Sequence, residues 1–77
     1  MSQHEFIQKV KNCLFEESSA VDAATVLNDL DGWDSLGRLS IVVMLHDEFY
    51  LTVDTKTLRA CETIGDLLDL VRTKLDN

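Results

Sequence analysis

The sequence contains no proline and only three glycines among its 77 residues. This scarcity excludes collagen-like repeats, polyproline segments and glycine-rich low-complexity chains. Long hydrophobic runs are missing too, because no stretch reaches the roughly 18 consecutive apolar residues of a membrane-spanning helix. The first ten residues lack a basic region followed by an apolar run, so the sequence predicts no signal peptide.

Basic residues are scarce, with 7 Lys and Arg against 14 Asp and Glu and a net charge of −7. Binding to nucleic acid requires clustered Lys and Arg, so this composition argues against a nucleic-acid partner and against anionic membrane surfaces. An acidic protein is suited to docking on basic patches of other proteins. The alternative is that the charge only keeps a small protein soluble, and the charge alone does not decide between these two.

Residues that carry catalysis or bind metals are also few. The two cysteines, Cys13 and Cys61, do not have metal-ligand spacing and fall on or near apolar helical faces. We interpret both as reduced, small core residues of a cytoplasmic protein. The two histidines, His4 and His46, are far apart, and no nucleophile, base and orienting group come together. We therefore expect neither an enzyme nor a metal site.

What the chain does contain is helical periodicity. Its length allows one domain, over 1–77. Ser2 with Glu5, and Thr63 with Asp66, form capping-box patterns that begin helices. Apolar spacing predicts helices at about 3–16, 35–49, 56–61 and 63–75. We expect an all-α fold, a small four-helix bundle with three main helices, one short helix, and a long loop between the first two.

That loop, 17–34, is unusually long for a compact domain. It contains apolar side chains at four points, Val21, Val26, Leu27 and Leu30. We expect these side chains to pin the loop across the helices.

The second predicted helix is apolar on more than one side. Ile41, Val42, Leu45 and Phe49 share one broad arc, and Leu39 can be counted with it. A second apolar group falls mostly on the opposite arc, namely Leu36, Val43 and Met44. Exposed apolar residues rimmed by charge often mark an interaction site. The alternative is that the long loop or the short third helix covers them.

The segment Gly32-Trp33-Asp34-Ser35-Leu36 lies where the long loop turns into the second helix. Here the chain resembles the acyl carrier protein family, whose attachment motif is D-S-L at the start of the second helix. The similarity extends over nearly the whole chain, through Val42, Leu45, Glu48 and Phe49 to Thr63-Ile64-Gly65-Asp66-Leu67. A chance D-S-L occurs in about a few per cent of chains this long, so its position carries the argument.

Ser35 is well placed for a phosphate, because a helix N-terminus offers free N–H groups and a positive dipole end. It is a weak nucleophile without a base, and His46 lies about 16 Å further along the same helix. The resemblance implies that a phosphopantetheinyl transferase, using coenzyme A and Mg²⁺, attaches 4′-phosphopantetheine to Ser35 and recognises Asp34. The alternative is that Ser35 or Asp34 is only an N-cap.

The resemblance also implies a function. The thiol of the arm would carry an acyl group as a thioester and present it to a loading enzyme and to downstream acyl-processing enzymes, so the chain would be a carrier and not a catalyst. We expect a monomer. The residues expected to contact partners are Leu36, Val43, Met44, Asp47 and Glu48.

One departure from the family concerns the pathway. The first turn of the second helix reads Gly37-Arg38, where members that serve fatty acid synthesis usually have acidic residues. This favours a specialised acyl or polyketide pathway. Two alternatives stay open. The Trp33-Asp34-Ser35 form also resembles stand-alone carriers that receive an amino acid, and an unmodified adaptor could bind a partner helix through the same apolar residues.

Overall fold

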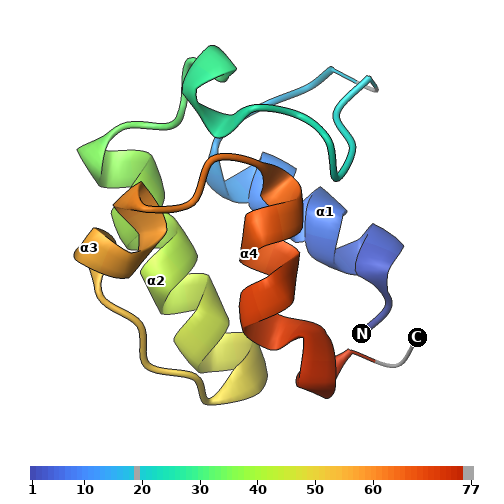
Figure 1. Ribbon diagram of the computed structural model, residues 1–77, viewed down its shortest axis with the longest axis vertical. Helices are drawn as coiled ribbons and strands as arrows, with labels where there is room; N and C mark the ends of the chain where they lie inside the picture. Colours follow the sequence, from blue (N-terminus) through green and yellow to red (C-terminus); the bar gives the residue numbers. More distant parts are fainter. Residues whose placement is uncertain (19, 76–77) are drawn as a thin grey trace.

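The computed structural model describes residues 1–18 and 20–75. Within these residues it has no β-strand, apart from one isolated antiparallel bridge between Val26 and Thr63. The α-helices are α1 (Gln3–Cys13), α2 (Ser35–Phe49), α3 (Thr55–Arg59) and α4 (Ile64–Val71) (Figure 1). Two short 3₁₀ helices are also present: η1 (Leu27–Asp29) lies between α1 and α2, and η2 (Arg72–Lys74) directly follows α4. The predicted small all-α bundle is confirmed.

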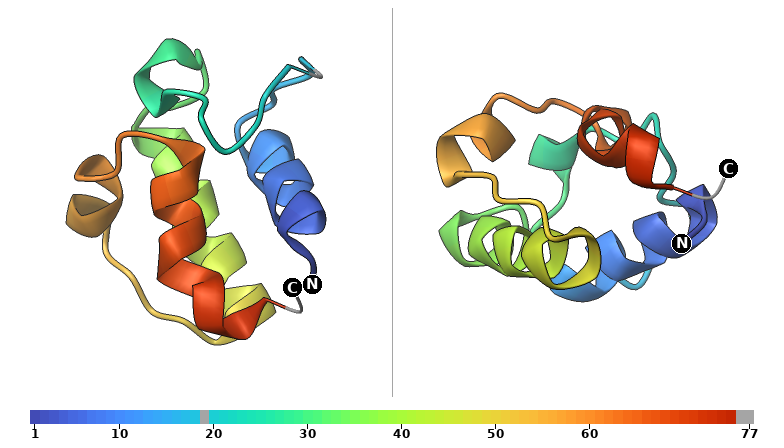
Figure 2. Two further views of the ribbon diagram at one scale, coloured as in Figure 1. Left: turned by 45° about the vertical axis from the view of Figure 1, so that its right-hand side comes forward. Right: turned by 90° about the horizontal axis from the view of Figure 1, so that it is seen from below.

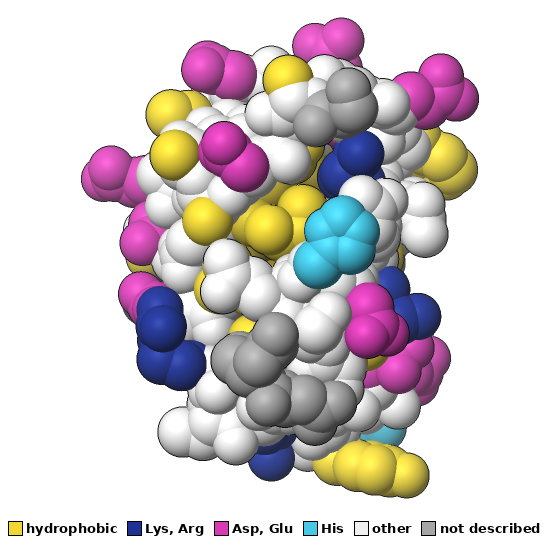
Figure 3. Space-filling view, turned by 90° about the vertical axis from the view of Figure 1, so that its right-hand side faces the viewer, with side chains coloured by type: hydrophobic (Ala, Val, Ile, Leu, Met, Phe, Trp, Pro, Cys, Tyr) yellow, Lys and Arg dark blue, Asp and Glu magenta, His cyan; other side chains and the backbone are white. Residues whose placement is uncertain are grey.

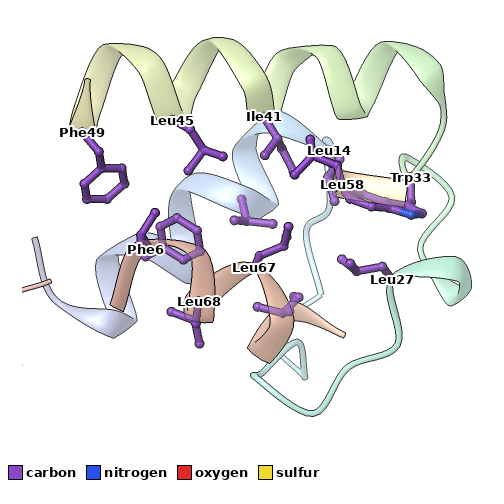
Figure 4. Close-up of a cluster of buried hydrophobic side chains, with 13 residues drawn as sticks. Phe6, Leu14, Leu27, Trp33, Ile41, Leu45, Phe49, Leu58, Leu67 and Leu68 are labelled. Carbon is purple, nitrogen blue, oxygen red and sulfur yellow. The ribbon is translucent and has the colours of Figure 1, made fainter. Parts of the chain in front are cut away.

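The helices surround a single hydrophobic core. Figure 2 shows α1, α2 and α4 as the long sides of the bundle, with the short α3 beside α2. Ile41, Leu45 and Phe49 project from α2 toward Phe6 of α1 and Leu67 of α4 (Figure 4). The rings of Phe6 and Phe49 lie 6.0 Å apart between their centroids. The helical spacing of apolar residues therefore produces the buried face that the sequence predicts.

Both predicted capping boxes are present. The Ser2 hydroxyl accepts a hydrogen bond from the Glu5 backbone N–H at 3.1 Å, and the Glu5 carboxylate accepts one from the Ser2 N–H. Thr63 and Asp66 form the same reciprocal pair at the start of α4. Each such cap contributes about 1 kcal/mol, which is a substantial share of the stability of a domain this small.

Some predicted boundaries are wrong. The first helix ends at Cys13 and not near residue 16, because the backbone of Phe15 is left-handed, with φ of 56°. The short helix covers Thr55–Arg59 instead of 56–61, since the Asp54 side chain caps it one residue earlier. The last helix is α-helical only to Val71 and continues as η2.

The long connection, described except for residue 19, is pinned largely as predicted. Leu27 is fully buried, and Val21 and Leu30 are half-buried. Val26 is the exception, because its side chain is 42% exposed while its backbone pairs with Thr63. Further backbone bonds join this loop to the start of α4, including Leu27 N–H to Glu62 C=O at 2.8 Å. The connection is therefore held by both side chains and backbone.

The two cysteines are free and half-buried. Both pack against the edge of the core, so the prediction that they are core residues holds only in part. Burial raises the pKa of the Cys13 thiol and, with Asp66 and Asp69 nearby, that of Cys61. None of the described helices is long and apolar enough to cross a membrane.

Candidate functional site

The start of α2 is capped by Asp34. Its backbone is extended, and its Oδ1 accepts a hydrogen bond from the Gly37 N–H at 2.8 Å. Ser35 is the next residue and the first of the helix, with an exposed side chain. No described residue forms a hydrogen bond with the Ser35 hydroxyl. Asp34, and not Ser35, is therefore the N-cap of α2. The Ser35 hydroxyl has no hydrogen-bond partner among the described residues.

Close backbone packing fixes the direction of this helix end. A Cβ atom added to Gly37 would lie 1.9 Å from the Gly32 carbonyl oxygen and 2.8 Å from Leu14 Cδ2. A Cβ atom on Gly32 would lie 2.1 Å from the Leu14 carbonyl oxygen. Only glycine allows three backbone segments to approach this closely. The loop, the end of α1 and the first turn of α2 therefore form one rigid support for Ser35.

The buried side chain of Trp33 fixes the position of Asp34 and Ser35, the two residues that follow it. Its side chain is buried at one end of the core, near Leu27 and Leu58 (Figure 4). The Arg38 guanidinium carbon lies 5.6 Å from the centroid of the Trp33 ring, within the range of a cation–π contact. The buried Trp33 side chain thus fixes the segment before Ser35 to the core. Its ring also restrains the Arg38 guanidinium, which lies one helical turn after Ser35.

A shallow pocket opens beside the Ser35 side chain. It has a volume of about 130 Å³ and is lined by Ser35, Arg38, Thr55 and Arg59, which we call the arginine pocket. Neither arginine forms an ion pair with a carboxylate of the described residues. The first turn of α2 contains no acidic residue. Two arginine side chains without carboxylate partners therefore line the pocket beside Ser35, in a chain of net charge −7.

A second pocket, of about 250 Å³, lies next to the motif between the end of α1 and the first turn of α2. Cys13, Phe15 and Leu36 are among the residues that line it. Phe15 is 91% exposed because its left-handed backbone turns the ring outward. The sequence periodicity does not indicate this pocket, because it places Phe15 inside the first helix, which ends at Cys13.

The predicted apolar surface of α2 is present, but it contains Leu39 in place of Met44. Leu36, Leu39 and Val43 are 74%, 53% and 51% exposed, and we call them the α2 apolar patch. Leu39 belongs to the exposed patch, so its assignment to the core arc is wrong. Met44 is half-buried and packs against the core, so its assignment to the exposed arc is wrong.

Two acidic residues, Asp47 and Glu48, follow this patch toward the end of α2. Asp47 and Glu48 are both exposed, as expected. Glu48 is not free, because its Oε1 lies 3.0 Å from Lys9 Nζ of α1. Figure 3 shows the side of the molecule that lies at the right of Figure 1, away from α2, where Asp and Glu side chains lie mainly toward the edges and Lys and Arg side chains occur at several points among them.

Neither histidine reaches Ser35. His4 and His46 are exposed, and the nearest carboxylate oxygen to His46 is that of its neighbour Asp47, at 3.8 Å. In the described part of the chain, no group of three or more His, Cys, Asp or Glu side chains could hold a metal ion.

Comparison with known proteins identifies the family of this chain. Residues 10–71 match the family described as the phosphopantetheine attachment site. The chain is 33% identical over 79 residues to an acyl carrier protein of Thermotoga maritima, covering 96% of each chain. This chain belongs to the acyl carrier protein family. It is also 28% identical over 80 residues to an acyl carrier protein of Thermosynechococcus vestitus, covering 97% of this chain and 98% of the relative. No solved structure matches it.

Acyl carrier proteins are carriers and not enzymes, and the prosthetic group of the family is covalently bound phosphopantetheine. The start of α2 fits this group. A phosphodiester bond needs an accessible hydroxyl, and that of Ser35 is exposed and unbonded. The charge of a phosphodiester needs nearby donors, and Arg38 and Arg59 line the same pocket without carboxylate partners.

Proposed function

We propose that Ser35 is the attachment residue and that the chain is a carrier of acyl groups in a specialised pathway. The observation that carries the proposal is the division of roles at the start of α2. Asp34 caps the helix, and the adjacent Ser35 hydroxyl has no structural partner among the described residues. A phosphopantetheine arm on Ser35 would therefore cost the fold no hydrogen bond.

The chain does not carry out its own modification. Arg38, Thr55 and Arg59 share the pocket with Ser35, and none of them is a base that could accept the hydroxyl proton near neutral pH. A transferase must supply that base. The Ser35 oxygen would attack the coenzyme A phosphorus nearer the pantetheine, and the P–O bond to adenosine 3′,5′-bisphosphate would break. The proton would pass to the transferase, whose Mg²⁺ would supply stabilisation of the departing phosphate.

The loaded arm carries the cargo as a thioester between its terminal sulfur and a carboxylic acid. The α2 apolar patch follows Ser35 along the same helix, so an enzyme that receives the arm would also contact Leu36, Leu39 and Val43. These residues with Asp47 and Glu48 form the partner surface that we propose. A single carrier domain over 1–77, a monomeric state and a cytoplasmic location stay predictions from the sequence.

A specialised pathway is favoured by the charge next to Ser35. Partners that dock through basic residues would meet Arg38 in the first turn of α2, which contains no acidic residue, and Arg59 in the same pocket. Such partners would be repelled there, which selects a dedicated set of enzymes. An amino acid as cargo remains an alternative of the same carrier type. The unmodified adaptor has less support, because it gives no reason for an exposed, unbonded serine beside two arginines.

The test is intact mass after the purified chain is incubated with coenzyme A, Mg²⁺ and a broad-specificity phosphopantetheinyl transferase. The wild type is expected to gain one phosphopantetheinyl group, and Ser35→Ala none. Ser40→Ala is the matched control, because Ser40 is an exposed serine of the same helix, and it should load as the wild type does. A folded wild type that stays unmodified with several transferases would favour the adaptor.

A further inference from the structure

The arginine pocket brings two positive side chains from different helices to the hydroxyl of Ser35. Arg38 comes from α2 and Arg59 from the short α3, and both line the pocket with Ser35. We propose that Arg38 and Arg59 bind the phosphodiester of the arm, so that the base of the arm is held against α3. This proposal rests on Ser35 being the attachment residue.

The spacing of the residues allows the contact. Ser35 and Arg38 are three residues apart on one helix, so their side chains are neighbours on its surface, with Cβ atoms about 5–6 Å apart. A phosphate on the Ser35 oxygen would extend into a pocket of about 130 Å³ whose opposite wall is Thr55 and Arg59. A guanidinium group can donate two parallel hydrogen bonds to phosphate oxygens. Both arginines can therefore reach one phosphodiester.

The charges of the site favour the same contact. Arg38 and Arg59 have no carboxylate partner in the described residues, whereas Lys9 is paired with Glu48 and Arg72 with Asp69. The Asp34 carboxylate is adjacent to Ser35 and would repel a phosphodiester. Two unpaired guanidinium groups on the other side of Ser35 would offset that repulsion. An anion beside Ser35 thus supplies the partner that both arginines lack.

Arg38 is also held in place before any arm arrives. Its guanidinium carbon lies 5.6 Å from the centroid of the buried Trp33 ring. A side chain already restrained in this way loses less conformational freedom when it binds a phosphate. The consequence is a preferred direction, since an arm fixed at its phosphate leaves Ser35 toward α3 and away from the second pocket at Cys13 and Phe15.

The test follows arginine side-chain NMR signals and thermal stability as the unloaded chain is converted to the loaded chain. In the wild type, loading should shift the Nε–Hε signals of Arg38 and Arg59 and leave that of the ion-paired Arg72 unchanged. At low ionic strength, loading should raise the melting temperature by about 4 °C, and added salt should reduce this gain. Arg59→Gln, and the double variant Arg38→Gln with Arg59→Gln, should reduce the gain and move the phosphorus-31 resonance of the arm.

Lys56→Gln is the matched control, because Lys56 is an exposed cation of α3 that does not line the pocket. It should keep both the temperature gain and the phosphorus resonance. If the wild type gains the arm by mass but neither arginine signal moves, this inference is wrong while Ser35 remains the attachment site. If no transferase loads the wild type, the proposed function fails and the inference with it. If inorganic phosphate shifts both arginine signals in Ser35→Ala and the arm shifts neither in the wild type, the pocket binds free phosphate, which also overturns the inference.

Discussion

The Asp34 carboxylate accepts a hydrogen bond from the Gly37 N–H at 2.8 Å, and this bond assigns the roles at the start of α2. A helix needs an oxygen acceptor at its N-cap, and here the residue before the serine supplies it. Ser35 is therefore the first helical residue, with its hydroxyl exposed. Asp34 thus stabilises the start of the helix, whereas the adjacent Ser35 offers the hydroxyl for modification.

The first prediction separates these two roles by stability. Asp34→Ala should lower the free energy of unfolding by about 1 kcal/mol, because the Gly37 N–H loses its acceptor. Ser35→Ala should stay within about 0.5 kcal/mol of the wild type, because the hydroxyl has no described partner. Urea denaturation measures both, and Asp34→Asn, which can still cap, is the control. Equal losses for Asp34→Ala and Ser35→Ala would show that the serine also caps.

The second prediction concerns the close approach at Gly37. Gly37→Ala should destabilise the chain by about 1–3 kcal/mol, because the new methyl group would overlap the Gly32 carbonyl and Leu14. Ser40→Ala, on the exposed side of the same helix, should change stability little. Thermal or urea unfolding decides the matter. A Gly37→Ala variant as stable as the wild type would mean that the loop moves away at little cost.

The third prediction is a pH dependence of stability that arises at Asp66. The backbone N–H groups of Glu62 and Thr63 donate to its carboxylate at 2.7 and 3.1 Å and lower its pKa below the ordinary value. A depressed folded-state pKa stabilises the fold above the unfolded value of about 3.9, and this contribution is lost as pH falls through the folded-state pKa. Urea unfolding between neutral pH and acid should therefore show a decline that Asp66→Asn reduces.

The control for this pH series is Asp29→Asn, because the Asp29 carboxylate accepts no hydrogen bond from a described residue. It should keep the wild-type decline. A decline of the same size in Asp66→Asn as in the wild type would place the acid-sensitive groups elsewhere.

The fourth prediction uses the two thiols. Burial raises the pKa of Cys13 and Cys61, so fewer of these groups are thiolate at neutral pH. Alkylation by iodoacetamide, followed by intact mass, should be slower in the folded chain than in concentrated urea. After loading, one additional thiol should react ahead of both. Rates that are the same with and without urea would contradict the burial of the two cysteines.

The sequence was sufficient for the helices because their signals are local. The capping boxes at Ser2 and Thr63 and the apolar spacing along each helix depend only on nearby residues. The end of α1 was missed because the left-handed backbone of Phe15 has no strong local signal, unlike a glycine. The presence of each helix was thus predictable from the sequence. The end of α1 was not, because it depends on a left-handed backbone conformation that an aromatic residue seldom adopts.

The interface residues show a different limit. At about 100° per residue, Leu39 lies about 160° from the buried Ile41, whereas Met44 lies only about 60° from it. Helical geometry thus explains why Leu39 is exposed and Met44 is half-buried, and the two were assigned to the wrong arcs. The arginine pocket had no signal in the sequence at all, because Arg38 and Arg59 are brought together by the packing of α3 beside α2.

The central claim is that the arm is bound to Ser35, and fragmentation of the loaded protein tests it most directly. Trypsin cleaves after Lys11 and Arg38, and the peptide 12–38 between them contains Ser18 and Ser19 as well as Ser35. Tandem mass spectrometry of this peptide should place the phosphopantetheinyl group on Ser35 alone. A group found on another residue, or a loaded protein whose 12–38 peptide is unmodified, would contradict the account.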